Sequence, residues 1–364
     1  MTTPIPTFYN PKTVDTIRRI PYEALATEAQ TYAQANHITP AGHDKARICL
    51  LAIDVQNTFC LPDFELFVGG RSGIGAVQDT QRLCEFIYRN LDINTEILPT
   101  MDTHSAAQIF HAVFWVNEAG EHPAPMTMIS DKDVQNGVWK VNPLVAKKLA
   151  QQLSQPSSHQ QSSQRSDNSK TVNIEAFAQH YAQQLSNKEK YPLTIWPYHS
   201  MLGGIGHALV PAFEEACFFH NMVRNSQTRF EAKGDNPLTE NYSVLSPEVL
   251  NNESEQPIAQ KNNRLIQHLL DFDAIIIAGQ AKSHCVAWTV SDLLSEIQTI
   301  APTLARKVAN KVYLLDDCTS PVVVPGVVDF TESAEETYAQ FANAGMNIVN
   351  TGESPTNWPN FPRK

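Results

Sequence analysis

The feature that most constrains the fold is a repeated alternation of short aliphatic runs with longer amphipathic stretches. The aliphatic runs lie at residues 47–54, 94–102, 229–234, 273–280, 311–317 and 346–350. Continuous apolar runs of this length are typical of parallel strands that are buried on both faces. Helical patterns lie between them at about 74–90, 207–222, 258–271, 285–298 and 331–344. The alternation predicts an α/β fold, with a three-layer, open, mostly parallel, Rossmann-like sheet and helices on both faces.

The segments outside this alternation predict the domain organisation. Residues 1–44 precede the first aliphatic run and are expected to form an N-terminal extension. Residues 45–353 then form a single domain, with an insertion at about 112–190. Within the insertion, residues 151–170 are rich in Ser and Gln and have almost no apolar side chains, which predicts a disordered or mobile loop. A helix is expected after it, at 173–185.

Charge and hydropathy exclude several classes of partner. The formal net charge is -11 and the 27 Lys and Arg residues are scattered, which argues against binding to nucleic acid or to an anionic membrane surface. The first residues lack a signal-peptide pattern, and no apolar run is long enough to span a bilayer. The 6 cysteines form no CxxC pair, so disulfides are not expected. The sequence predicts a soluble cytoplasmic protein with a small-molecule partner, and a homo-oligomer remains open.

Chemically useful side chains follow several of the expected strands. Right-handed crossovers place the carboxyl ends of parallel strands at one edge of a sheet, where α/β proteins bind ligands. Cys285 opens a helix, whose N-terminus favours a thiolate and whose free amides suit an oxyanion. Asp54 could carry the thiol proton, and Lys233 could hold the charges of both groups together. Each residue alone also fits a structural role, so their convergence is what favours a cysteine nucleophile.

A possible metal site follows the second expected strand. Asp102 and His104 lie two residues apart and could share one metal ion, with His199 as the best third ligand. His111 and His122 are weaker candidates for a further position. Zinc, iron and manganese all remain open. Phe59 and Trp196 lie near these groups in the sequence and could form the walls of a pocket for a flat ring, although core packing explains them equally well.

Together these motifs resemble the isochorismatase-like cysteine hydrolases, and in particular their nicotinamidase branch. The opening motif is "LLAIDVQNTFC" and the metal motif is "DTH". "WPYHSMLGGIGHAL", "EAKGDNPLTENYSVL" and "AGQAKSHCVAWTVSDLL" resemble the segments that carry a further metal ligand, the lysine and the nucleophile. The five motifs occur in the order of the family. Departures include Ser200 in place of a usual Cys, Gly204 in place of Thr, and the tripeptide 282–284 before the nucleophile.

The resemblance implies a function and a role for each residue. The catalytic triad would be Asp54, Lys233 and Cys285; the metal ligands would be Asp102, His104 and His199; Phe59 and Trp196 would hold a pyridine ring between them. A cis peptide bond before Ala281 would help the amides of Ala281 and Cys285 to form the oxyanion hole. One divalent metal ion is implied, with zinc as the first choice and iron or manganese as alternatives. The implied reaction is hydrolysis of nicotinamide to nicotinic acid and ammonia through a thioester.

Two alternatives share this fold. The same triad could hydrolyse another small amide, such as an N-carbamoyl compound or a ureide. The chain could also be a non-catalytic binding protein, although the intact Asp, Lys and Cys set argues against that. Cleavage of isochorismate is less favoured, because the D-x-H pair would then have no role.

Overall fold

The structure is a computed structural model that describes residues 2–153, 173–187 and 191–362. Within these ranges, a six-stranded sheet has the order β12-β9-β8-β1-β2-β7, and all of its neighbouring pairs are parallel. The strands are β1 (Ile48–Ile53), β2 (Glu96–Asp102), β7 (Glu231–Lys233), β8 (Ala274–Gly279), β9 (Val312–Leu315) and β12 (Asn347–Val349). Each corresponds to one aliphatic run of the sequence, so the predicted parallel α/β fold is confirmed.

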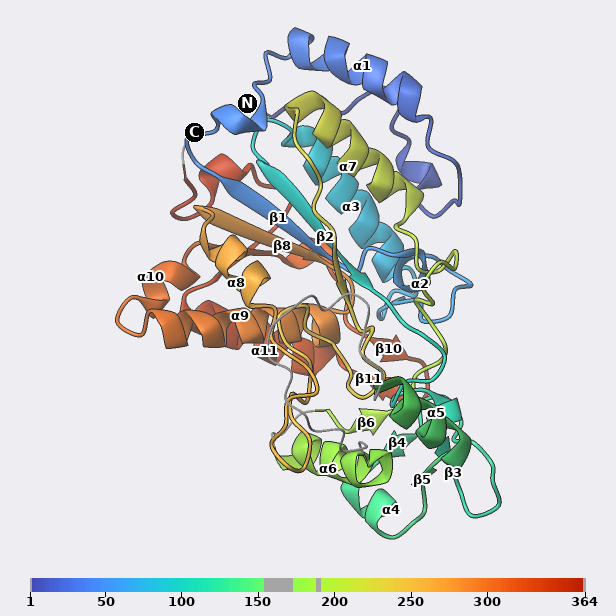
Figure 1. Cartoon of the computed structure of the whole chain (residues 1–364). Helices are drawn as coiled ribbons and strands as arrows, with labels where there is room; N and C mark the ends of the chain where they lie inside the picture. The colour runs from blue at the N-terminus through green and yellow to red at the C-terminus, as the bar shows by residue number, and fades with distance from the viewer. Residues whose placement is uncertain (1, 154–172, 188–190, 363–364) are drawn as a thin grey trace.

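Helices cover both faces of the sheet and make three layers (Figure 1). One layer contains α3 (Gly75–Arg89) and α7 (Pro211–Arg224). The opposite layer contains α8 (Asn263–Leu270), α9 (Ala287–Ile300), α10 (Ala305–Ala309) and α11 (Thr331–Ala344). Strands β1 and β8 are buried at every residue, because apolar side chains from both layers pack on them. Among the described residues, no helix combines the length and the apolar character that are needed to cross a membrane.

The segment predicted to be an insertion lies at the carboxyl ends of the strands (Figure 1). Its described parts contain β3 (Trp115–Val116), β4 (Met128–Ile129), α4 (Asp131–Gln135), β5 (Lys140–Val141), α5 (Pro143–Leu153) and α6 (Ile174–Asn187), followed by β6 (Leu193–Thr194). These elements form two small antiparallel sheets, β3-β5 and β4-β6, around an apolar cluster that includes Trp115, Phe177 and Trp196. Of the Ser/Gln-rich loop expected at 151–170, residues 154–170 lie outside the described residues.

The N-terminal residues pack on the outer side of one helical layer. Helix α1 (Tyr22–Ala35) lies against α7, with the ring of Tyr32 5.4 Å from that of Phe219. Arg18 forms an ion pair of 2.8 Å with Glu215 on α7. The first 44 residues therefore add a further helix outside the three layers and lie away from the edge where the candidate site is found (Figure 1).

Candidate active site

The candidate site lies where the order of the strands changes direction. From β1 the chain adds β2 and β7 on one side, and β8, β9 and β12 on the other. In open α/β sheets this switch point leaves a crevice at the carboxyl ends of the strands. Asp54 follows β1, and Cys285 follows β8. Asp102 and Lys233 end β2 and β7 and are direct neighbours in the sheet register. The topology thus brings four of the predicted residues to one edge.

The turn that carries Cys285 has an unusual backbone. Gly279 has φ 121°, and a Cβ at this position would lie 2.0 Å from the carbonyl oxygen of Ile53. Ala281 has φ 63°, and residues Lys282–Val286 then form a single π-helical turn that leads into α9. No peptide bond within the described ranges is cis, so the expected cis bond before Ala281 is wrong. The left-handed residues Gly279 and Ala281 redirect the chain between trans peptide bonds.

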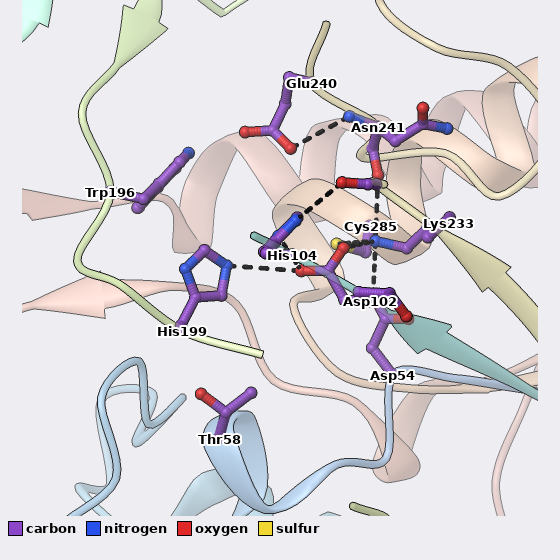
Figure 2. A network of polar contacts seen from close by, with 12 residues as sticks. Asp54, Thr58, Asp102, His104, Trp196, His199, Lys233, Glu240, Asn241 and Cys285 are labelled. Carbon is purple, nitrogen blue, oxygen red and sulfur yellow. Dashed lines mark hydrogen bonds and ion pairs between the residues drawn. The ribbon is translucent and has the colours of Figure 1, made fainter. Parts of the chain in front are cut away.

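Lys233 lies at the centre of the polar groups (Figure 2). Its Nζ is 2.9 Å from Asp54 Oδ2, 2.8 Å from Asp102 Oδ1 and 3.6 Å from Cys285 Sγ. It also donates a hydrogen bond of 3.0 Å to the backbone carbonyl of Asn241. All of these side chains are buried. One ammonium group therefore joins two carboxylates and a thiol in a region that is shielded from water.

The charges of this cluster follow from burial and neighbours. Burial alone lowers the pKa of Lys233, but the carboxylates of Asp102 and Asp54 hold it well above its ordinary value, so the lysine stays charged. Burial raises the pKa of the Cys285 thiol well above its ordinary value, and this outweighs the opposing effect of Lys233. The position at a helix start led us to expect a stabilised thiolate. In the structure, desolvation wins, so the resting thiol is protonated and needs a base.

The Asp54 carboxylate is the candidate for that base, and its position is fixed by Thr100 on β2. The Thr100 hydroxyl donates to Asp54 Oδ1 at 2.5 Å and accepts from the Asp54 backbone N–H at 3.0 Å. Asp54 has φ 50°, a left-handed conformation that is uncommon outside glycine but better tolerated by Asp. A hydrogen bond with the Asp54 carboxylate is also one of the effects that raise the pKa of Cys285. Thr100 therefore holds the carboxylate beside the thiol.

Asp102, His104 and His199 form a buried cluster that could hold a metal ion. Their candidate ligand atoms all lie within 4.8 Å of one another. Asp102 Oδ2 is 2.8 Å from His104 Nε2 and 3.4 Å from His199 Nε2. Gln56 fixes the backbone of Asp102 on both sides: its Oε1 accepts the Asp102 N–H at 2.8 Å, and its Nε2 donates to the Asp102 carbonyl at 2.9 Å.

The hydrogen bonds of the two histidines fit a metal site. Nδ1 of His104 lies 3.0 Å from the Gly234 carbonyl, and Nδ1 of His199 lies 2.7 Å from the Pro197 carbonyl. A carbonyl accepts only from N–H, so both rings carry a proton on Nδ1 and can present the lone pair of Nε2. Nε2 of His104 is buried and faces Asp102 Oδ2 at 2.8 Å, so the two candidate ligand atoms point toward the same space. One carboxylate and two imidazoles form a donor set that suits a divalent transition metal.

The two weaker histidine candidates differ in position. The ring of His111 packs 5.8 Å from that of His104 and 6.1 Å from that of His199, and its Nε2 is buried without a hydrogen-bond partner in the structure. It is not a member of the three-residue cluster. His122 instead lies 2.6 Å from the Trp115 carbonyl through its Nδ1. His111 is thus a neighbour of the cluster, whereas His122 has a contact within the insertion.

A cavity of about 560 Å³, measured out to its mouth, connects these groups. Cys285, Lys233, Asp102 and His199 reach its wall, as do the predicted aromatic residues Phe59 and Trp196 and the oxyanion candidate Ala281. The remaining wall is mostly apolar, with side chains from residues 66–68 and 322–324. The structure therefore places a thiol, a cation, a metal-type cluster and aromatic side chains around one space.

Some residues of the site carry no signal that the sequence analysis used. Thr100 lies inside a buried strand. The sequence signal for it was its position two residues before Asp102, which places both side chains on the same face of the strand. Glu240 and the Asn241 carbonyl lie in a long segment without helical or strand periodicity. Lys282 was noted only as a departure from the family. It is buried, and its Nζ is 2.7 Å from Asp316 and 2.6 Å from Glu335, so it links the turn before Cys285 to α11.

Comparisons with known proteins gave matches only among solved structures. No protein-family model and no curated protein matches the chain. An Acinetobacter baumanii nicotinamidase/pyrazinamidase is 16% identical, with 85% of this chain and 98% of that chain covered and a TM-score of 0.47. The yeast nicotinamidase bound to nicotinaldehyde is 16% identical, with 83% and 99% covered and a TM-score of 0.46. The pyrazinamidase of Pyrococcus horikoshii in complex with zinc is 15% identical, with 84% and 99% covered and a TM-score of 0.41.

These proteins come from the group that the sequence motifs resemble. The identities and TM-scores are low, so the fold rests on the observed sheet and the function on the site itself.

Proposed function

We propose that the chain is a cysteine-dependent hydrolase of small carboxamides, with nicotinamide as the first candidate substrate. The observation that carries this proposal is the position of Lys233, whose Nζ contacts Asp54 and Asp102 and lies 3.6 Å from Cys285 Sγ. A buried cation between a carboxylate and a thiol can stabilise the thiolate that forms when the carboxylate takes the thiol proton. The neighbouring aromatic side chains and the metal-type cluster suit a heteroaromatic ring.

The reaction would take place in two stages. Asp54 takes the proton of the Cys285 thiol, and the sulfur attacks the carbonyl carbon of the amide. The oxyanion lies at the backbone amides of Ala281 and Cys285, and Asp54 returns the proton to the leaving nitrogen, which releases ammonia and a thioester. Water, activated by Asp54, then cleaves the thioester to give the carboxylic acid and the free thiol. Lys233 keeps its positive charge throughout and balances the changing charges of its neighbours.

Asp102, His104 and His199 would hold a divalent metal ion, with zinc as the first candidate and iron or manganese as alternatives. When bound, the ion supplies a Lewis acid that can bind a ring nitrogen and orient the substrate. The residues of the chain still carry every proton in the proposed reaction.

The proposal is tested by ammonia release from nicotinamide, with the wild-type protein, the Cys285→Ala variant, and Cys84→Ala as a matched control. Cys84 is a buried cysteine on α3 that does not line the cavity. We expect Cys285→Ala to abolish release and Cys84→Ala to retain it. Release that persists at the wild-type rate in Cys285→Ala would rule out the thioester route.

Metal dependence and substrate range are tested in the same assay. We expect chelation to lower release and re-addition of one divalent ion to restore it, with bound metal measured by elemental analysis. A panel of small amides, including N-carbamoyl compounds and ureides, then identifies the preferred substrate. Cysteine-dependent release from a ureide but not from nicotinamide would retain the triad and replace the proposed substrate.

A further inference from the structure

The cavity contains one charged side chain to which the proposed reaction gives no role, that of Glu240. This residue is only 6% exposed, and it lies on the cavity wall beside Trp196, Tyr242 and Cys285. A buried carboxyl group normally receives several hydrogen bonds or pairs with a cation, because desolvating an unpaired charge costs free energy. The contacts of Glu240 therefore indicate whether each of its two carboxyl oxygens has a hydrogen-bond donor in the protein.

The backbone of Glu240 is held on both sides. Its N–H donates to the Tyr181 hydroxyl at 3.1 Å, and its carbonyl accepts the Glu248 N–H at 2.9 Å. In the side chain, Oε1 accepts the backbone N–H of Asn241 at 3.0 Å. These contacts give the carboxyl group one defined orientation.

The second carboxyl oxygen, Oε2, differs from the first. No side chain or backbone group among the described residues donates a hydrogen bond to it, and no described Lys, Arg or His forms an ion pair with Glu240. In Figure 2 one oxygen is bonded to Asn241, and the other points toward the side of the cavity where Trp196 lies. Burial raises the pKa of Glu240 to about 7, in agreement with a carboxylate that lacks sufficient partners. The cavity thus presents one hydrogen-bond acceptor on a mostly apolar wall.

We propose that Glu240 is a specificity-determining residue, which accepts a hydrogen bond from an N–H or O–H substituent on the ring of a heteroaromatic carboxamide. This inference rests on the proposed function for the identity of the ring, although it concerns binding and not the chemical step. The N–H groups of unsubstituted nicotinamide belong to its carboxamide, which the proposed reaction places at Cys285, and the open positions of its ring offer Oε2 only C–H groups. Sites with a buried hydrogen-bonding group discriminate strongly against ligands that lack the partner. The preferred substrate class is therefore an amino- or hydroxyl-substituted pyridine carboxamide or a close relative.

The test uses matched ligands and a protein that cannot turn them over. Binding of nicotinamides that carry an amino or a methyl group at the same open ring carbon is measured by calorimetry, with zinc-loaded Cys285→Ala protein at about pH 8, where a carboxyl group with a pKa near 7 is mostly ionised. The two substituents are similar in size, and only the amino group donates a hydrogen bond. We expect the amino compound to bind about tenfold or more tightly at one ring position.

Glu240→Gln then tests the polarity of the contact without a change in shape. The Asn241 N–H still requires an acceptor, so Oε1 of the glutamine stays in place and its NH2 group replaces Oε2 at the cavity. We expect the preference for the amino compound to disappear or invert. Glu215→Gln, a buried carboxyl group on α7 that does not line the cavity, is the control and should retain the preference.

Equal binding of both members of every pair, absence of binding, or a preference that survives Glu240→Gln would overturn the inference. Turnover is measured separately, with the wild-type nucleophile present. Absence of Cys285-dependent ammonia release would reject the proposed function, while a Glu240-dependent amino preference would still support the binding role. The two failures are therefore distinguishable.

Discussion

At the scale of single residues, the site depends on the charge of Lys233. A lysine this deeply buried is stable as a cation only because Asp54 and Asp102 contact it directly. The same contacts link the proposed nucleophile to the metal-type cluster, since Asp102 also faces His104 and His199. A change in any one of these charges is expected to affect both parts of the site.

Thr100→Val tests how Asp54 is positioned. The change keeps the shape of the side chain but removes a donor to Asp54 Oδ1 and an acceptor for the Asp54 N–H. We expect kcat to fall about tenfold or more with a small change in KM, and stability to fall by about 1–3 kcal/mol because buried groups lose partners. Thr80→Val is the control: Thr80 is a buried threonine on α3 that donates to the Ala76 carbonyl and does not line the cavity. Equal kcat values for the two variants would contradict the assigned role of Thr100.

The protonation of Cys285 can be followed by alkylation. Because burial raises the thiol pKa well above its usual value, the thiolate fraction at neutral pH is below that of free cysteine. The rate of iodoacetamide labelling at Cys285, read by peptide mass spectrometry, should be slow near neutrality and still rise above about pH 9. Asp54→Asn removes a negative charge that raises this pKa, so it should shift the rate profile to lower pH. A wild-type profile that levels off below about pH 8 would contradict the assignment.

At the scale of elements, the turn after β7 supports the metal-type cluster. Gly234 has φ 86°, and a Cβ there would lie 2.7 Å from Cε1 of His104. Its carbonyl is also the partner of His104 Nδ1. This turn therefore fixes the position and the tautomer of one candidate ligand.

Gly234→Ala is expected to displace His104 and weaken metal binding about tenfold to a hundredfold, the range found when a partner of a metal ligand is disturbed. Gly73→Ala is the matched control, because Gly73 has φ 78° and open space around its Cα. Both variants carry the cost of a left-handed alanine, but only the first meets a histidine. The measurement is metal affinity by competition with a chelator. Equal affinities would show that the turn does not support the cluster.

At the scale of the whole molecule, two segments lie outside the alternating strands and helices of the central sheet. They are the described parts of 112–190 and the N-terminal residues that precede β1. The described parts of the segment at 112–190 share one apolar cluster with the cavity residue Trp196. The N-terminal residues lie along the outer side of α7, away from the carboxyl ends of the strands (Figure 1). The first segment packs against a residue of the cavity wall, whereas the N-terminal residues contribute buried apolar contacts with α7.

Deletion of residues 1–36 is expected to separate stability from activity. It removes the buried side chains of Val14, Leu25 and Tyr32 and exposes Phe219 on α7. At about 1.5–3 kcal/mol for each large apolar side chain, the loss should exceed about 5 kcal/mol and lower Tm clearly. Ammonia release at low temperature should stay within about twofold of the full chain, since no residue of the cavity is removed. An unchanged Tm would show that the extension does not stabilise the fold.

The order of the sheet elements along the chain and the side chains at the carboxyl ends of its strands could be predicted from the amino-acid pattern alone. The period of apolar residues reports whether a segment is a strand or a helix, and the crossover rule places all parallel strand ends together. Asp54, Asp102, Lys233 and Cys285 could therefore be assigned to one edge without knowledge of any distance. Their catalytic and metal-binding roles remain proposals.

The contacts among these side chains could not be predicted from the sequence, because they depend on how distant segments pack. The hydrogen bond from Thr100 to Asp54 joins two residues that lie 46 positions apart in the chain. It depends on the register between β1 and β2. The raised pKa of Cys285 depends on atoms from several elements, whereas its place at a helix start suggested the opposite direction. Glu240 reaches the cavity from a segment without periodicity. Local patterns report backbone pairing and the buried face, but desolvation and side-chain distances are set by the packing of distant segments.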